Sequence, residues 1–164
     1  MAQKIIPIQN QSIQQASKNS LMKKYAPTNC MVYASQIKSV SDAMAKDSHS
    51  IGKLQREESK NFAEGLLLGW LVYLNEILNL KNPMSETQMN LAAQLICEEF
   101  YMLKMSELTL LFKRIISGQY GEFYERLSID KVLTFFRKYL EERFEIAIDE
   151  SSRNHRDLKQ NESI

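Results

Sequence analysis

Apolar residues recur at helical spacing through the centre of the chain. Between Lys53 and Leu80 they follow one another mainly in steps of three and four, which places them on one face of a helix. This helix is expected to end just before Pro83, because proline disfavours helical geometry in the residue that precedes it. We therefore predict a central core helix over residues 53–80. Its inward positions are Phe62, Leu66, Leu67, Trp70, Leu71, Leu74, Ile77 and Leu78.

Three further helices are expected after this proline. Ser85 and Gln88 have the spacing of a capping box, so a second helix should begin there. Ser106 is the expected N-cap of a third helix, which Gly118 should end, and Ser128 is the expected N-cap of the last one. The positions expected to face inward are Met89, Ala93, Ile96, Phe100 and Leu103, then Leu108, Leu111, Phe112, Ile115 and Ile116, and finally Val132, Phe135, Phe136, Tyr139, Leu140 and Phe144.

The two ends of the chain are more polar than its centre. Residues 1–27 are rich in Gln, Asn, Ser and Lys without a helical apolar repeat, which predicts a flexible polar arm. Residues 149–164 have no apolar face and are expected to form a disordered tail. The remaining 28–148 form the predicted helical domain, with its core in 53–148. The expected fold is all-α, a compact bundle of four or five helices.

Composition agrees with a helical fold. The 164 residues include only five Gly and three Pro, too few for the many tight turns of a β-sandwich or barrel. Cys30 and Cys97 lie far apart and lack partners at metal-ligand spacing, so a reducing compartment is the simpler interpretation. The amino terminus lacks a signal-peptide pattern, and no apolar run reaches the length of a membrane span. We therefore expect a cytoplasmic protein that does not contact membranes.

No residue pattern predicts catalysis, a metal site or a cofactor. His49 and His155 lie in polar stretches about a hundred residues apart, without a nucleophile or metal partner nearby. Glu98-Glu99 is better explained by a solvent-facing position than by paired carboxylates. Gly65 and Gly69 are interpreted as letting a neighbouring helix approach the core helix closely. The sequence thus favours a protein that is not an enzyme.

Charge is distributed unevenly along the chain. Residues 1–56 carry a net charge of +6 and the remainder carries −5, although the whole chain has only +1. Lysines attract phosphates by displacing counterions, so this basic third is a candidate contact for nucleic acid or an acidic protein. The candidate nucleic-acid-binding residues are Lys18, Lys23, Lys24 and Lys38. A plain solvated segment is the alternative interpretation.

The most distinctive stretch, residues 113–126, combines charge, glycine and aromatic side chains. In the structural interpretation, Gly118 is a left-handed C′ residue and the aromatic side chains cover the core. In the functional interpretation, the same stretch is a docking corner for a protein or a stacking platform for bases. The candidate partner-binding residues are Lys113, Arg114, Gln119, Tyr120, Phe123, Tyr124 and Arg126.

This stretch also carries a resemblance. An amphipathic helix running into the segment from Gly118 to Tyr124, then Leu127-Ser128 and a last helix with Tyr139, resembles small uncharacterised all-helical proteins of bacterial phages and mobile elements. The resemblance covers residues 84–146. In size, helix content and basic arm the chain is also similar to phage helicase loaders. These likenesses imply no catalytic residues.

Two functional hypotheses follow. The first is a non-enzymatic phage or mobile-element adaptor that engages a replication helicase or another host protein. The second is direct DNA or RNA binding through the basic amino-terminal third and the corner that contains Tyr120, Phe123 and Tyr124. A protein partner is thus expected and nucleic acid is possible, while homo-oligomerisation is left open by the sequence.

Overall fold

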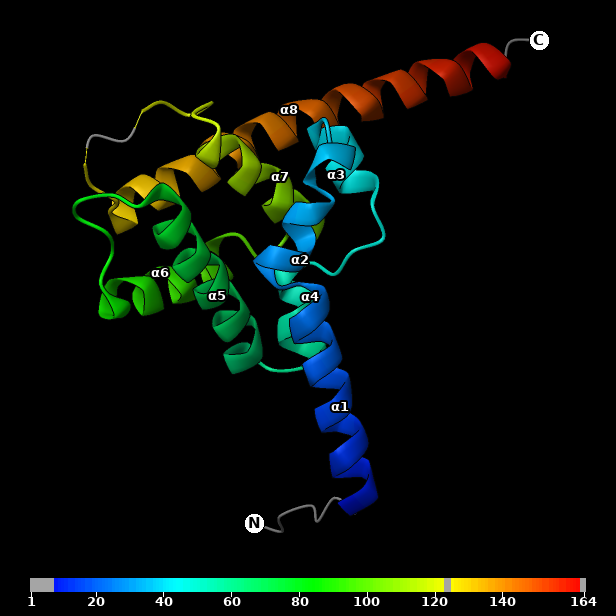
Figure 1. Cartoon of the computed structure of the whole chain (residues 1–164). Helices are drawn as coiled ribbons and strands as arrows, with labels where there is room; N and C mark the ends of the chain where they lie inside the picture. The colour runs from blue at the N-terminus through cyan, green and yellow to red at the C-terminus, as the bar shows by residue number, and fades with distance from the viewer. Residues whose placement is uncertain (1–7, 123–124, 163–164) are drawn as a thin grey trace.

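Helices make up nearly all of the regular structure of the chain (Figure 1). The computed structural model describes residues 8–122 and 125–162. Within these ranges the fold is all-α as predicted, with eight α-helices, one short 3-10 helix and no strand. None of the helices described is long and apolar enough to cross a membrane. The elements are α1 (Ile8–Lys24), α2 (Pro27–Val32), η1 (Ala34–Gln36), α3 (Val40–Ala45), α4 (Ile51–Glu57), α5 (Lys60–Leu78), α6 (Glu86–Glu99), α7 (Met105–Ile116) and α8 (Ile129–Asn161).

Most of the predicted helix ends are confirmed by their capping groups. Ser85 and Gln88 form the reciprocal capping box of α6, and the Ser128 side chain accepts the Lys131 N–H at the start of α8. The predicted N-cap at Ser106 is wrong, because the N-cap of α7 is Lys104, two residues earlier. The Ser106 hydroxyl instead donates to the carbonyl of Ala43 at 2.7 Å and so joins α7 to α3.

The predicted central helix is divided in two. The Ser59 side chain accepts the N–H of Phe62 and caps a new helix, so α4 and α5 replace one continuous element. Five helices, α4 to α8, lie in the predicted core region, and α1 to α3 precede them. The core also extends beyond the predicted boundary at residue 53, since Tyr25, Ile37, Val40 and Ala43 belong to it.

The core is centred on aromatic side chains of α5, α7 and α8. Trp70 is fully buried and meets the ring of Phe112 edge-on at 4.9 Å between centroids, and Phe112 meets Phe136 at 6.2 Å. The indole N–H of Trp70 donates to the carbonyl of Tyr25 at 2.9 Å, which ties the amino-terminal region to α5. Ile77 and Phe144, both expected in the core, are instead 48% and 50% exposed, because the faces that carry them turn away from the packed elements.

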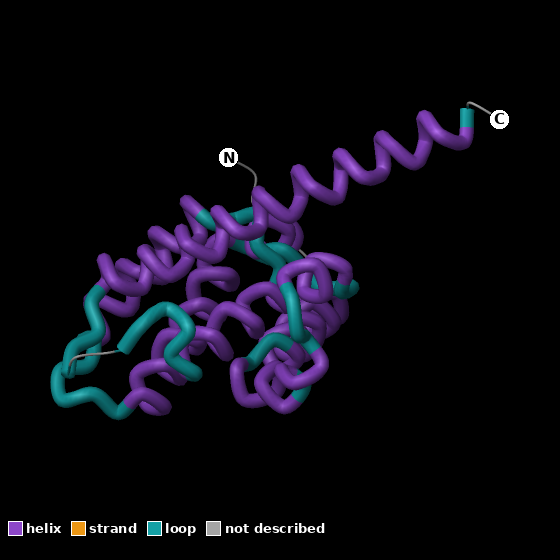
Figure 2. Tube along the Cα trace, turned by 90° about the horizontal axis from the view of Figure 1, so that it is seen from above, coloured by secondary structure: helices purple, strands orange, loops and turns teal. Residues whose placement is uncertain are grey.

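Two helices project from this body (Figures 1 and 2). α1 occupies most of the predicted arm, 1–27, and extends away from the body on one side. The predicted break at Asp149 is not found: α8 continues to Asn161, because its last turns contain no Gly or Pro and extend an existing helix with Arg, Lys, Leu and Gln. The carboxyl-terminal end of α8 is exposed on all sides.

The glycine pair of α5 does not serve the close helix packing expected of it. Gly65 and Gly69 lie on an exposed face, and a Cβ atom at either position would meet nothing within 4 Å. The core face of α5 is formed instead by the larger residues between them, Leu66 and Leu67. No contact in the described structure therefore requires glycine at these two positions.

Candidate functional site

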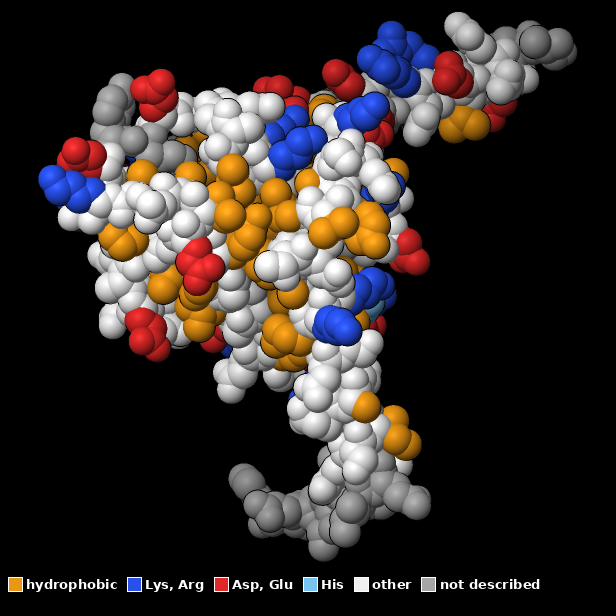
Figure 3. Space-filling model, viewed as in Figure 1, with side chains coloured by type: hydrophobic (Ala, Val, Ile, Leu, Met, Phe, Trp, Pro, Cys, Tyr) orange, Lys and Arg blue, Asp and Glu red, His pale blue; other side chains and the backbone are white. Residues whose placement is uncertain are grey.

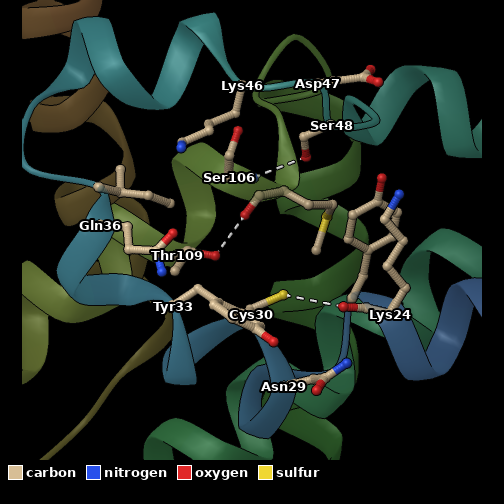
Figure 4. A pocket seen from close by; sticks show the side chains of 13 residues that line it. Lys24, Asn29, Cys30, Tyr33, Gln36, Lys46, Asp47, Ser48, Ser106 and Thr109 are labelled. Carbon is tan, nitrogen blue, oxygen red and sulfur yellow. Dashed lines mark hydrogen bonds between the residues drawn. The ribbon is translucent and has the colours of Figure 1, made fainter.

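A pocket of about 330 Å³ opens between α2 and the first turns of α7 (Figure 4). Segments that are distant in sequence form its lining. They are the carboxyl-terminal end of α1, the helices α2 and η1, the loop that follows α3, and α7. The residues lining it are Lys24, Tyr25, Asn29, Cys30, Tyr33, Gln36, Ile37, Lys46, Asp47, Ser48, Met105, Ser106 and Thr109. A pocket of this size can receive one or a few apolar side chains of a ligand.

The position of α2, which forms one wall, is fixed by Tyr25. The buried Tyr25 hydroxyl accepts the backbone N–H of His49 at 3.0 Å and lies 2.6 Å from His49 Nδ1. Because the hydroxyl oxygen already accepts one hydrogen bond, its own proton is available for the imidazole nitrogen. Pro27 follows at the first position of α2, where its missing N–H costs no helical hydrogen bond.

The polar groups of the opposite wall are engaged within the protein. Thr109 donates to the Met105 carbonyl at 3.0 Å, and the Ser106 N–H donates to the Ser48 hydroxyl at 3.1 Å. The Lys104 ammonium group donates to the carbonyls of Met44 and Lys46 and holds the loop after α3. With these hydrogen bonds made internally, the wall presents mainly apolar surface to a ligand.

The rim of the pocket is exposed and mixed in character. Tyr33, just after α2, lines the pocket and is 57% exposed, and its neighbour Val32, which does not line it, is 69% exposed. Figure 3 shows that hydrophobic side chains gather across the face formed by α2 and α5. Lys24 and Lys46 add positive charge to the rim, and Asp47 adds one negative charge. This arrangement suits an apolar side chain with acidic neighbours.

The thiol in the pocket is not an activated nucleophile. Burial raises the pKa of Cys30, and the nearby charge of Lys24 only partly opposes this effect. Its Sγ atom lies 3.5 Å from the carbonyl oxygen of Lys24. A raised pKa keeps the group as a neutral thiol at neutral pH, and thiolate is the reactive form. In this form Cys30 adds apolar surface to the pocket.

At the predicted docking corner, both cations of α7 are held within the protein. Arg114 forms a bidentate ion pair with Glu142 of α8 at 2.6 and 3.2 Å, and its guanidinium lies 5.9 Å from the centre of the Tyr139 ring. Lys113 donates to the carbonyls of Ala34 and Ile37 at 3.3 and 3.4 Å. Both side chains thus connect α7 to its neighbours.

The predicted left-handed glycine at this corner is confirmed. Gly118 has φ of +80°, its N–H donates to the Ile115 carbonyl, and the N–H of Gln119 donates to the Arg114 carbonyl, the two bonds of a Schellman motif. Tyr120 stacks on Phe135 with 5.6 Å between ring centres, as expected for an aromatic side chain that covers the core.

The remaining corner residues lie on the outside or beyond the described ranges. Gln119 and Arg126 are exposed, and the backbone of Arg126 forms an isolated bridge with Asn82. Phe123 and Tyr124 lie outside the described residues. Among the candidate partner-binding residues that the structure describes, Gln119 and Arg126 are the exposed ones, and their role in binding stays a prediction.

The candidate nucleic-acid lysines are distributed over two regions. Lys18, Lys23 and Lys24 belong to α1, where a spacing of five and then one residue places them on different sides of the helix. Lys38 is exposed in the turn before α3, and its backbone N–H donates to the Asp42 carboxylate. Of the four, Lys24 lines the pocket.

Sequence reasoning missed the pocket itself. Its walls come from segments that are far apart in the chain, and no separate helix was predicted for α2, which forms one of them. The available signal was Pro27 at a helix start followed closely by the adjacent large residues Met31, Val32 and Tyr33, too many to face inward on so short a helix.

One comparison with known proteins gives a match. Residues 81–161 match the model of a family of unknown function, DUF6633. The match includes α6, α7 and all of α8, and it leaves out α1 to α5, which contain the α2 wall of the pocket. No curated protein and no solved structure matches the chain.

Proposed function

We propose that this protein is a non-enzymatic adaptor that binds another protein through the pocket between α2 and α7. The observation that carries the proposal is an open, mainly apolar pocket of about 330 Å³ lined in part by the exposed aromatic side chain of Tyr33. Exposed aromatic side chains beside a cavity are typical of the residues that dominate protein binding energy. The ligand is then a peptide segment with an apolar anchor and acidic neighbours.

The charges around the pocket support this kind of ligand. Lys24 and Lys46 stand on its rim with Asp47, and the amino-terminal third to which they belong carries +6. Positive rim charges accelerate association with acidic segments and select against basic ones. The narrower hypothesis, a phage or mobile-element adaptor that engages a replication helicase in the bacterial cytoplasm, rests on the sequence resemblance.

The test compares two tyrosines of similar exposure. Tyr33 at the pocket is 57% exposed and Tyr101, at the end of α6, is 53% exposed. The full chain is immobilised, proteins captured from a bacterial lysate are identified, and the affinity of the leading candidate is measured for both alanine variants. Tyr33→Ala should weaken binding by at least tenfold, the usual effect of a hot-spot truncation, whereas Tyr101→Ala should leave it unchanged. Equal affinities for the two variants would contradict the proposal.

Direct binding of nucleic acid is the second candidate function, and one observation favours it. α1 carries Lys18, Lys23 and Lys24 without any acidic residue and projects from the body. Binding to bare DNA or RNA should then weaken steeply with added salt. Replacement of Lys18 and Lys23 by Gln should reduce this binding, while the pocket variant Tyr33→Ala should not.

A further inference from the structure

The outer side of α8 carries an apolar stripe without a partner in the described structure. Phe144, Ile148 and Leu158 are 50%, 65% and 62% exposed. With Ser151 and His155 between them, these positions follow in steps of four, three, four and three. This is the spacing of the inner face of a coiled coil.

The stripe faces away from the body. Successive helical residues are rotated by about 100°, which turns the stripe by about 100° from Arg143 and by about 140° from Tyr139. Tyr139 is fully buried and Arg143 pairs with Glu107 of α7, so this second face is already used. The last contact with the body in this region is the hydrogen bond from Ser41 to Glu150 at 2.7 Å. Beyond it α8 runs on alone (Figure 1).

Charges beside the stripe are separated along the helix axis. Glu145 and Asp149 are acidic in the first half, and Arg156 and Lys159 are basic in the second half, all on the same flank of the stripe. A second α8 laid parallel would bring like charges together. Laid antiparallel, the acidic half of each helix lies along the basic half of the other.

We infer that α8 pairs with α8 of a second copy of this chain as an antiparallel two-helix coil formed by residues 144–161. With the twofold axis near Arg153, Ile148 of each chain lies against Leu158 of its partner. Glu145 then faces Lys159, while Asp149 and Arg156 lie further out on the same flank. The interface is isologous, so every contact is made twice.

Pairing of this kind is consistent with the extent of the family match. The match to DUF6633 continues to residue 161 and so includes the turns of α8 that have left the body. The inference does not depend on the proposed pocket function. If both hold, two pockets are linked in one particle, and a partner with two binding segments gains apparent affinity from the linkage.

The experiment is sedimentation velocity of the full chain across the micromolar range. We expect a concentration-dependent dimer. Glu145→Lys should raise the dissociation constant by roughly tenfold, because two attractive pairs become repulsive in each dimer. The reciprocal double variant Glu145→Lys/Lys159→Glu should return it to the original value. Asp157→Lys, which makes the same charge change on the opposite side of α8, is the matched control and should have no effect.

A second pair of substitutions tests the apolar contacts. Ile148→Ser and Leu158→Ser should each abolish the dimer, while circular dichroism of the α-helical body stays unchanged, since both side chains lie on the outer surface. A chain that stays monomeric at all concentrations overturns the inference. So does a dimer that survives the two serine variants, or a charge swap that fails to restore association, because either result places the interface elsewhere or in another orientation.

Discussion

α7 has two sides with different roles. On the side toward α8, Glu107 is fully buried, its carboxylate lies 2.7 Å from Arg143, and Arg114 is fixed by Glu142. On the side toward α2, Met105 and Thr109 line an open pocket. The first side is rich in charge and closed, whereas the second is mostly apolar and accessible. Conspicuous charged residues in a sequence can therefore mark an internal connection, while the residues that line an open pocket are less distinctive.

The largest expected effect comes from breaking the ion pair between Glu107 and Arg143, on the side of α7 that faces α8. Arg143→Ala removes the countercharge of the buried Glu107 and leaves its carboxylate with only the hydrogen bonds from the Lys104 N–H and the Tyr139 hydroxyl, which should cost about 3 kcal/mol of unfolding free energy. Urea denaturation measures the loss. Adding Glu107→Gln should restore part of it, because the buried charge is then gone. A loss well below 1 kcal/mol would show that Glu107 does not depend on this pair.

Tyr120 gives the next largest effect. Tyr120→Ala removes the ring stacked on Phe135 and should lower the unfolding free energy by about 2 kcal/mol, without changing partner affinity per folded molecule. The buried hydroxyl of Tyr120 lies near the Arg114 guanidinium, which is already paired with Glu142, and it has no hydrogen bond of good geometry to a described residue. Tyr120→Phe should therefore keep full stability. If Tyr120→Ala kept normal stability but lost partner binding, the docking interpretation of residues 113–126 would be supported instead.

A smaller effect is expected at the carboxyl-terminal end of α7, where Gly118 ends the helix. Gly118→Ala should cost about 1 kcal/mol, because φ of +80° is strained for a residue with a Cβ atom. Gly65→Ala is the matched control on α5. It should stabilise by up to about 1 kcal/mol, since the added methyl group meets nothing and alanine favours the helix. Melting temperatures that change in opposite directions in the two variants would confirm that Gly118 requires the left-handed conformation. Equal changes would contradict it.

The smallest effect on stability is expected from chemical modification of Cys30, in the pocket on the side of α7 that faces α2. Burial raises the pKa of Cys30 and raises that of Cys97 to about 12. Both thiols should react slowly with iodoacetamide at pH 7, and their rates should rise with pH, because more thiolate forms as pH approaches the pKa. Cys30 should react first, since Cys97 is almost completely buried.

Mass spectrometry identifies the cysteine that has reacted. Modification of Cys30 should leave the melting temperature nearly unchanged and block partner binding, because the added group occupies the pocket. Faster reaction of Cys97, or binding that survives modification of Cys30, would show that this side of α7 is closed as well. Cys30→Ser treated in parallel controls for modification elsewhere.

The sequence predicted the fold class and several helix starts, because these depend on nearby residues. The capping box at Ser85 and the glycine at 118 act within a few positions, and both are confirmed. The division between α4 and α5 was missed because the Ser59 cap, which lies within the polar stretch 55–61, was not recognised. The end of α8 was misplaced for a different reason, since absence of an apolar face was taken as absence of helix.

The candidate site was beyond such local reasoning. The ion pair between Arg114 and Glu142 joins residues 28 positions apart, and neither side chain is distinctive alone. The pocket requires α2 and α7 to meet, which depends on long-range hydrogen bonds such as that from Trp70 to Tyr25. Spacing along a chain does not contain this information, so the charged corner was favoured and the pocket was not seen.

The same long-range connections bear on the order in which the chain folds. α5 and α6 are joined by a short loop and pack directly on each other, so their contact closes at low entropic cost. The hydrogen bond from Lys113 to Ala34 closes a segment of 79 residues, and Tyr25 reaches 45 residues forward to Trp70. Docking of α2 should therefore be a late step. A chain with an α5–α6 hairpin but an undocked α2 would have no pocket, so partner binding would report the completion of folding.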